Sequence, residues 1–176
     1  MKDIKKIILL EGLPMSGKTT ICDNLKRCKN NRLHIVDEIV IISDNNNIQD
    51  FFMKNDDLKC NMYGDGIVVI DRGPISILSY NEAKKKIIGN NEYEKVLNWF
   101  EKNYSSFYSN PKVFTYYLVN KKRVREYNDL DIYGSIKNQE ILEKITVKNI
   151  KHYCLNFKII NYSYEEMENL IDEIIN

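Results

Sequence analysis

The sequence predicts one α/β domain in which helices cover both faces of a parallel sheet. Short apolar segments typical of buried strands alternate along the chain with longer segments of helical periodicity. A length of 176 residues suits a single domain with one buried core, and no repeat, proline-rich linker or change in composition divides residues 1–176.

The predicted strands are short runs of apolar and β-branched residues, as expected for strands that are buried on both faces. GIVVID, residues 66–71, gives the strongest of these signals. In chain order, the strands are expected at residues 5–11, 32–37, 66–71, 112–119 and 157–161.

The predicted helices carry apolar residues at helical spacing. Pro74 suits the first turn of one helix, because the backbone donor that proline lacks is unpaired there anyway. In the helix over residues 49–63, we expect Phe52, Leu58 and Met62 to make the apolar contacts. The helices are expected at residues 19–29, 49–63, 74–87, 92–107, 135–153 and 164–175.

The turn after the first strand matches G-x-x-x-x-G-K-[ST] in full over residues 12–19. Because it lies between a buried strand and a helix, the match predicts a P-loop, which binds the phosphates of a nucleoside triphosphate. Glycines let backbone N–H groups point at phosphate oxygens, Lys18 adds a charge for the β and γ phosphates, and Thr19 offers a hydroxyl to Mg²⁺. The residues expected to bind the nucleotide are Gly12, Met15, Ser16, Gly17, Lys18, Thr19 and Thr20.

Acidic residues end two of the predicted strands, where a parallel sheet directs them at the phosphate site. Asp71 ends the third strand and could order Mg²⁺ through water; alternatively, it caps the helix entered at Pro74. Asp37 ends the second strand and Glu38 follows it, and one of these two carboxylates should emerge at the same edge of the sheet.

Two sequence motifs that are typical of GTPases are incomplete in this sequence. The guanine-binding N-K-x-D would begin at Asn120, but Arg123 stands in place of its aspartate and cannot accept the guanine hydrogens. A D-x-x-G switch beginning at Asp71 would need a glycine where Pro74 stands. These departures argue against a GTPase.

The chain resembles the nucleoside and nucleotide kinases, and the thymidylate kinases and deoxynucleoside kinases in particular. The resemblance rests on E-G-x-x-x-S-G-K-T-T near the N-terminus, an acidic residue ending the second strand, D-R-G-P-x-S after the third and an arginine-bearing polar loop after the fourth. It covers essentially the whole chain in order. It implies a five-stranded parallel sheet, ATP with Mg²⁺, and transfer of the γ-phosphoryl group to a small acceptor.

The resemblance also implies roles for particular residues. Arg72 would hold an acceptor phosphate or the reacting oxygen, and Arg123 and Arg125 would belong to a lid at about 120–134 that closes over ATP. Glu38 would take the proton from an acceptor hydroxyl, as in deoxynucleoside kinases, or help to arrange the acceptor and metal, as in thymidylate kinases. The sequence leaves open whether Glu38 or Asp71 is the base.

Departures from the thymidylate kinase pattern leave the acceptor open. Glu38 is followed by Ile39 rather than proline, and Val119 is followed almost at once by the basic cluster. The acceptor is expected to be a nucleoside or a nucleoside monophosphate. The alternatives are another small alcohol, such as an antibiotic or a cofactor precursor, and a P-loop switch that holds nucleotide without transferring phosphate to a small molecule.

Composition adds expectations about partners and location. A formal charge of only +1 gives no general attraction for nucleic acid, and the apolar run at residues 7–10 is too short for a membrane span or a signal peptide. The four cysteines lack C-x-x-C spacing, as expected of free thiols in a reducing compartment. We therefore expect a cytoplasmic protein that binds neither nucleic acid nor membrane, and a homodimer is left open.

Overall fold

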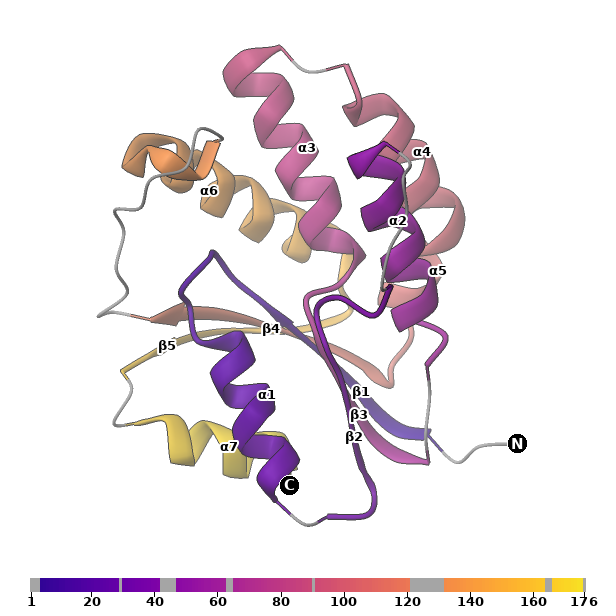
Figure 1. Ribbon diagram of the computed structural model, residues 1–176, viewed down its shortest axis with the longest axis vertical. Helices are drawn as coiled ribbons and strands as arrows, with labels where there is room; N and C mark the ends of the chain where they lie inside the picture. The colour runs from indigo at the N-terminus through magenta and orange to yellow at the C-terminus, as the bar shows by residue number, and fades with distance from the viewer. Residues whose placement is uncertain are drawn as a thin grey trace.

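The computed structural model of the protein describes residues 4–28, 30–41, 47–62, 65–89, 91–120, 132–163 and 166–175. These residues form a five-stranded sheet in the order β2-β3-β1-β4-β5, and all of its strand pairs are parallel (Figure 1). The strands are β1 Ile4–Glu11, β2 Leu33–Val36, β3 Gly66–Asp71, β4 Val113–Asn120 and β5 Asn156–Tyr162. The predicted α/β fold with a five-stranded parallel sheet is confirmed.

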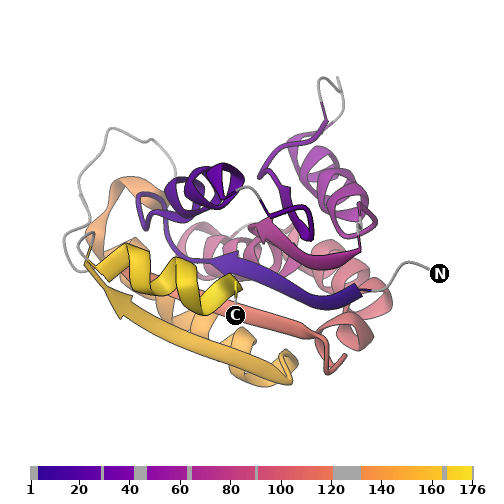
Figure 2. The same cartoon turned by 90° about the horizontal axis from the view of Figure 1, so that it is seen from below.

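Helices cover both faces of this sheet (Figures 1 and 2). On one face, helices α1 and α7 pack against apolar side chains of β1, β3 and β4. On the other face, helices α3 to α6 and part of α2 pack against the alternate side chains of the same strands. The helices are α1 Lys18–Arg27, α2 Ile48–Lys59, α3 Pro74–Ile88, α4 Tyr93–Asn103, α5 Ser105–Tyr108, α6 Ile136–Tyr153 and α7 Met167–Ile175.

The register of the sheet brings the carboxyl ends of three strands together. Leu10 of β1 pairs with Asp71 of β3, and Val36 of β2 pairs with Ile70 of β3. The turns after these three strands therefore begin side by side at one edge, where parallel sheets bind ligands.

Helix α2 differs from its prediction in the side that it buries. Phe52 and Leu58 are 37% and 52% exposed, and Met62, which lies beyond the end of α2 at Lys59, is 51% exposed, so the expected apolar contacts were wrong. The helix lies over the carboxyl edge of the sheet, where backbone carbonyls need polar partners, and it buries mainly polar side chains there. The buried residues of α2 are Gln49, Met53, Asn55, Asp56 and Lys59.

Candidate active site

The residues of the predicted P-loop form a tight turn between β1 and α1. Gly12 and Gly17 have φ of 144° and 92°, a region that favours glycine. A Cβ at Gly12 would lie 2.6 Å from the Leu118 carbonyl oxygen, so another side chain does not fit there. Gly17 is the N-cap of α1, so the first backbone N–H groups of that helix lie at the end of the loop.

Lys18 is buried inside this turn. Its Nζ atom donates to the carbonyl oxygens of Gly12 and Leu13 at 2.9 and 3.0 Å, and to Ser16 Oγ at 3.1 Å. Burial lowers the pKa of Lys18 to about 7. The loop therefore encloses the one cation that its sequence supplies. Of the other predicted nucleotide-binding residues, Met15 is 57% exposed and Thr20 is also exposed.

Thr19 and Asp71 lie together beside the loop. The Thr19 hydroxyl donates to Asp71 Oδ2 at 2.8 Å. Asp71 Oδ1 is buried and has no hydrogen-bond partner among the described residues, and burial raises the pKa of this carboxyl. Helix α3 begins after Gly73 without a side-chain cap, so Asp71 does not cap it. A hydroxyl and an unsatisfied carboxylate oxygen are ligands that suit Mg²⁺.

Of the two carboxylates after β2, Glu38 is the one that faces this site. Glu38 Oε1 lies 3.1 Å from an Nη atom of Arg72, whereas Asp37 lies 2.5 Å from Lys26 on the exposed side of α1. Arg72 has φ of 58°, a left-handed conformation that is uncommon for non-glycine residues. Its Nε atom is buried without a hydrogen-bond partner among the described residues.

A buried lysine that the sequence analysis missed holds these strand ends in place. Lys59 of α2 is 1% exposed, and its Nζ atom donates to the carbonyl oxygens of Glu38 and Asp71 at 3.2 and 3.1 Å. It also lies 2.8 Å from Asp56 Oδ1, and Asn55 Nδ2 donates to the Glu38 carbonyl at 2.8 Å. The spacing of these polar residues on one face of the helix could have revealed the contact.

Glu11, the last residue of β1, ties the P-loop strand to the start of α3. Its carboxylate accepts hydrogen bonds from the Gly73 amide at 2.9 Å and from the Ser76 hydroxyl. The side chain is fully buried, and burial raises its pKa to about 7. This contact fixes the turn that carries Arg72 relative to the P-loop.

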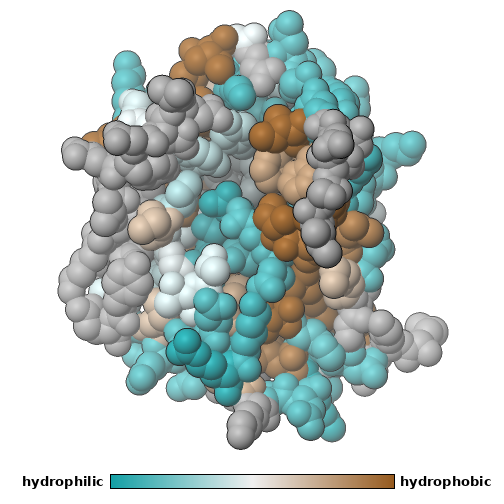
Figure 3. All heavy atoms as spheres, in the orientation of Figure 1, coloured by the Kyte–Doolittle hydropathy of each residue, from teal (hydrophilic) through white to brown (hydrophobic). Residues whose placement is uncertain are grey.

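A pocket of about 330 Å³ opens beside Glu38 and Arg72, between α2 and α3. Its walls include the exposed apolar residues Ile39, Ile48 and Phe52, and hydrophobic surface gathers over α2 in Figure 3. The aromatic residues Phe52 and Tyr80 line it from α2 and α3.

Two buried amides in this pocket orient each other. Asn81 Nδ2 donates to the Ile77 carbonyl at 2.9 Å and to Gln49 Oε1 at 2.8 Å. A carbonyl oxygen can only accept, so the contact with Ile77 fixes the direction of the Asn81 amide. Gln49 Nε2 and Asn81 Oδ1 are buried without partners among the described residues, so one donor group and one acceptor remain unsatisfied in the wall of the pocket.

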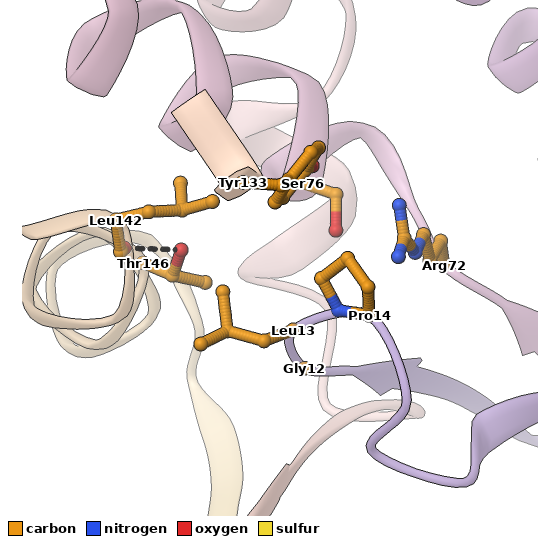
Figure 4. Close-up of a pocket in the computed structure, with 8 residues that line it drawn as sticks. All are labelled: Gly12, Leu13, Pro14, Arg72, Ser76, Tyr133, Leu142 and Thr146. Atoms are coloured by element: carbon orange, nitrogen blue, oxygen red, sulfur yellow. Dashed lines mark hydrogen bonds between the residues drawn. The ribbon is translucent and has the colours of Figure 1, made fainter. Parts of the chain in front are cut away.

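A second, smaller cavity of about 20 Å³ lies beside the P-loop. It is lined by the P-loop residues Gly12, Leu13 and Pro14 and, from α6, by Leu142 and Thr146 (Figure 4). Three residues, Arg72, Ser76 and Tyr133, line both cavities. The predicted P-loop and the larger pocket thus meet at Arg72.

Part of the predicted lid lies outside the described residues, including Arg123 and Arg125. The described end of that segment is a short 3₁₀ helix, Ile132–Gly134, whose Tyr133 ring lies 5.5 Å from the ring of Tyr80.

In the described part of the chain, no helix is long and apolar enough to cross a membrane.

No protein-family model and no curated protein matches this chain in sequence. Solved structures do match it. The thymidylate kinase of Ehrlichia chaffeensis has a TM-score of 0.64 at 13% identity, covering 98% of this chain and 97% of that one. The deoxyadenosine kinase of M. mycoides, with bound dCTP, has a TM-score of 0.64 at 13% identity over 95% of this chain and 97% of that one.

The thymidylate kinase of Candida albicans has a TM-score of 0.60 at 14% identity, covering 96% of this chain and 88% of that one. At these identities the likeness concerns the fold. The chain has the fold of the P-loop nucleoside and nucleotide kinases, as its motifs predicted.

Proposed function

We propose that this protein is a kinase that transfers the γ-phosphoryl group of ATP, with Mg²⁺, to a nucleoside or a nucleoside monophosphate. The observation that carries the proposal is the Glu38–Arg72 pair, 3.1 Å apart, at the junction of the P-loop and the pocket of about 330 Å³. A nucleotide-binding switch needs a phosphate site but has no need of a second pocket with a carboxylate at that junction.

The donor side follows from the P-loop. Lys18 would neutralise the β and γ phosphates, and the backbone N–H groups at the start of α1 would bind their oxygens. Thr19 and Asp71 would hold Mg²⁺, which offsets charge on the phosphates when it is bound. The unsatisfied Asp71 Oδ1 supports this assignment, because a buried carboxylate oxygen without a partner is costly.

The acceptor side assigns different duties to the nearby carboxylates. Glu38 lines the larger pocket, which supports a role as the base that takes a proton from an acceptor hydroxyl. Asp71 instead accepts a hydrogen bond from Thr19, which favours a role for Asp71 in binding the metal. Arg72 lines both cavities and would hold the transferring phosphoryl group or an acceptor phosphate. A guanidinium suits this role because it can donate two parallel hydrogen bonds to one phosphate group. Arg123 and Arg125 are proposed to close over ATP.

The pocket favours an acceptor that carries a nucleobase over a simple alcohol. Gln49 Nε2 and Asn81 Oδ1 offer one donor and one acceptor, and the edge of a base presents complementary groups next to each other. Apolar and aromatic side chains, including Phe52 and Tyr80, provide surfaces for a flat ring. A sugar or an amino alcohol would not use these surfaces.

A ligand panel tests the proposal. Thermal unfolding is measured with Mg²⁺ and ADP present, against nucleosides, nucleoside monophosphates and alcohols without a base. A true acceptor at a hundred times its Kd should stabilise the protein by about 2.7 kcal/mol. Each hit is then incubated with ATP, and the phosphorylated product is identified by mass spectrometry. Phosphorylation of base-free alcohols alone would refute the acceptor class, and ATP hydrolysis with no phosphorylated acceptor would refute the kinase.

The variant Gln49→Leu tests whether the amide pair in the pocket contacts the acceptor. It removes the proposed donor to the base while leaving the P-loop unchanged. The variant should lose stabilisation by the acceptor and keep stabilisation by ADP. Equal acceptor stabilisation in wild type and variant would show that the amide pair does not contact the acceptor.

A further inference from the structure

Tyr162 connects the last strand of the sheet to the P-loop. It is the final residue of β5, far from the P-loop in sequence, and it is 2% exposed. Its hydroxyl donates a hydrogen bond to the carbonyl oxygen of Ser16. The hydroxyl also lies so close to Gly17 that a Cβ at that position would clash with it. The Ser16–Gly17 peptide is therefore packed directly against this side chain.

The geometry of a peptide bond gives this contact a consequence for phosphate binding. In a planar trans peptide, the C=O and N–H bonds point in opposite directions. When the Ser16 carbonyl is held against Tyr162, the N–H of Gly17 must point away from Tyr162. Gly17 is the N-cap of α1, and N–H groups at a helix start are those that bind phosphate.

We propose that Tyr162 is a positioning residue for the P-loop, which fixes the Ser16–Gly17 peptide so that the Gly17 N–H faces the bound phosphates. Without the hydroxyl, the peptide gains freedom to rotate, and this N–H is no longer held in the binding orientation. The inference rests on the proposed nucleotide binding, and it assigns a function in that binding to a core tyrosine outside the motif.

Paired phenylalanine variants test the inference. Tyr162→Phe removes the hydroxyl and keeps the ring packing. Tyr116→Phe is the matched control: Tyr116 belongs to the same apolar cluster and is also buried, but its hydroxyl accepts from Lys6 at 3.4 Å rather than contacting the P-loop. The probes are ADP with Mg²⁺ and inorganic tripolyphosphate, which carries the phosphates without a base. Binding is measured by calorimetry at a temperature at which both variants are folded.

We expect Tyr162→Phe to bind both probes about tenfold more weakly, which corresponds to about 1.4 kcal/mol, and Tyr116→Phe to bind within twofold of wild type. In turnover, the KM for ATP should rise in Tyr162→Phe while the KM for the acceptor stays unchanged. A purely structural tyrosine would lower the melting temperature in both variants and leave probe affinity alone, and that result would overturn the inference. If wild-type protein fails to bind ADP, the proposed function itself fails, so the two failures are distinguishable.

Discussion

The proposed phosphate side and the proposed acceptor side of this site are assembled in different ways. On the phosphate side, all three partners of Lys18 lie within residues 12–16, so one short stretch of chain builds its own cation-lined turn. On the acceptor side, Glu38, Arg72 and Asn81 come from three separate segments, and Lys59 of α2 joins the ends of two strands. A contiguous turn depends on local backbone geometry, whereas the acceptor pocket depends on how α2 and α3 pack over the sheet.

This difference predicts which changes separate the two functions of the site. Substitutions in the P-loop should directly weaken the binding of ATP and ADP. Substitutions on the acceptor side should reduce turnover and acceptor binding while ADP affinity persists, because the P-loop needs none of those side chains to form.

Lys18→Ala should have the largest effect. Removing the buried charge should lower turnover by at least about 10³-fold, while the fold survives because Lys18 contacts only the loop itself. Lys26→Ala, on the exposed side of the same helix, is the control and should turn over normally. Normal ATP turnover in a folded Lys18→Ala protein would refute the assignment of the phosphate site.

Glu38→Gln should separate turnover from ADP affinity most clearly. The substitution keeps the shape of the side chain and removes the proposed base, so turnover should fall by roughly 10²- to 10⁴-fold while ADP affinity stays unchanged. Asp37→Asn is the matched control, because Asp37 is the adjacent carboxylate and contacts Lys26 instead. Turnover of Glu38→Gln within about threefold of wild type would instead point to Asp71 as the base. The assay uses the acceptor found in the ligand panel.

Lys59→Met tests whether the acceptor side depends on its buried ion pair. The substitution leaves Asp56 buried without its partner, so the free energy of unfolding should fall by about 3–5 kcal/mol. Turnover should fall by a larger factor than ADP affinity, since the carbonyls of Glu38 and Asp71 lose a shared donor. Replacing Asp56 by Asn in the same protein should recover part of the stability. Urea unfolding provides the measurement, and a loss below about 1 kcal/mol would contradict an energetic role for the pair.

The buried carboxyl group of Glu11 should have a smaller, pH-dependent effect on the free energy of unfolding. Burial raises its pKa from 4.5 to about 7, so between these values the folded protein binds more protons than the unfolded chain. Stability should therefore fall as pH rises from about 4.5 to about 7, by up to about 3 kcal/mol from this group. Glu11→Gln should lack this component while keeping an acceptor for the Gly73 amide. Urea unfolding at both ends of the range, compared between the two proteins, measures it; parallel pH profiles would contradict the assignment.

Where the sequence analysis was wrong, tertiary packing had overridden a local pattern. Phe52, Leu58 and Met62 were expected to make the apolar contacts of their predicted helix. Instead, α2 lies over the carboxyl edge of the sheet and buries polar residues such as Asp56 and Lys59. Helical periodicity identifies a face of a helix, but it does not show which surface that face will meet. The same limit kept the Gln49–Asn81 contact hidden, because its two residues belong to different helices.

The sequence by itself determined the alternation of strands and helices and the P-loop, because both depend on residues that are neighbours in the chain. It also narrowed the possible base to a few carboxylates. Only the tertiary structure decided that Glu38 faces Arg72 while Asp37 turns to Lys26, and that Asp71 bonds Thr19 instead of capping α3. Those choices depend on the parallel register of β1, β2 and β3, which brings together residues far apart in sequence.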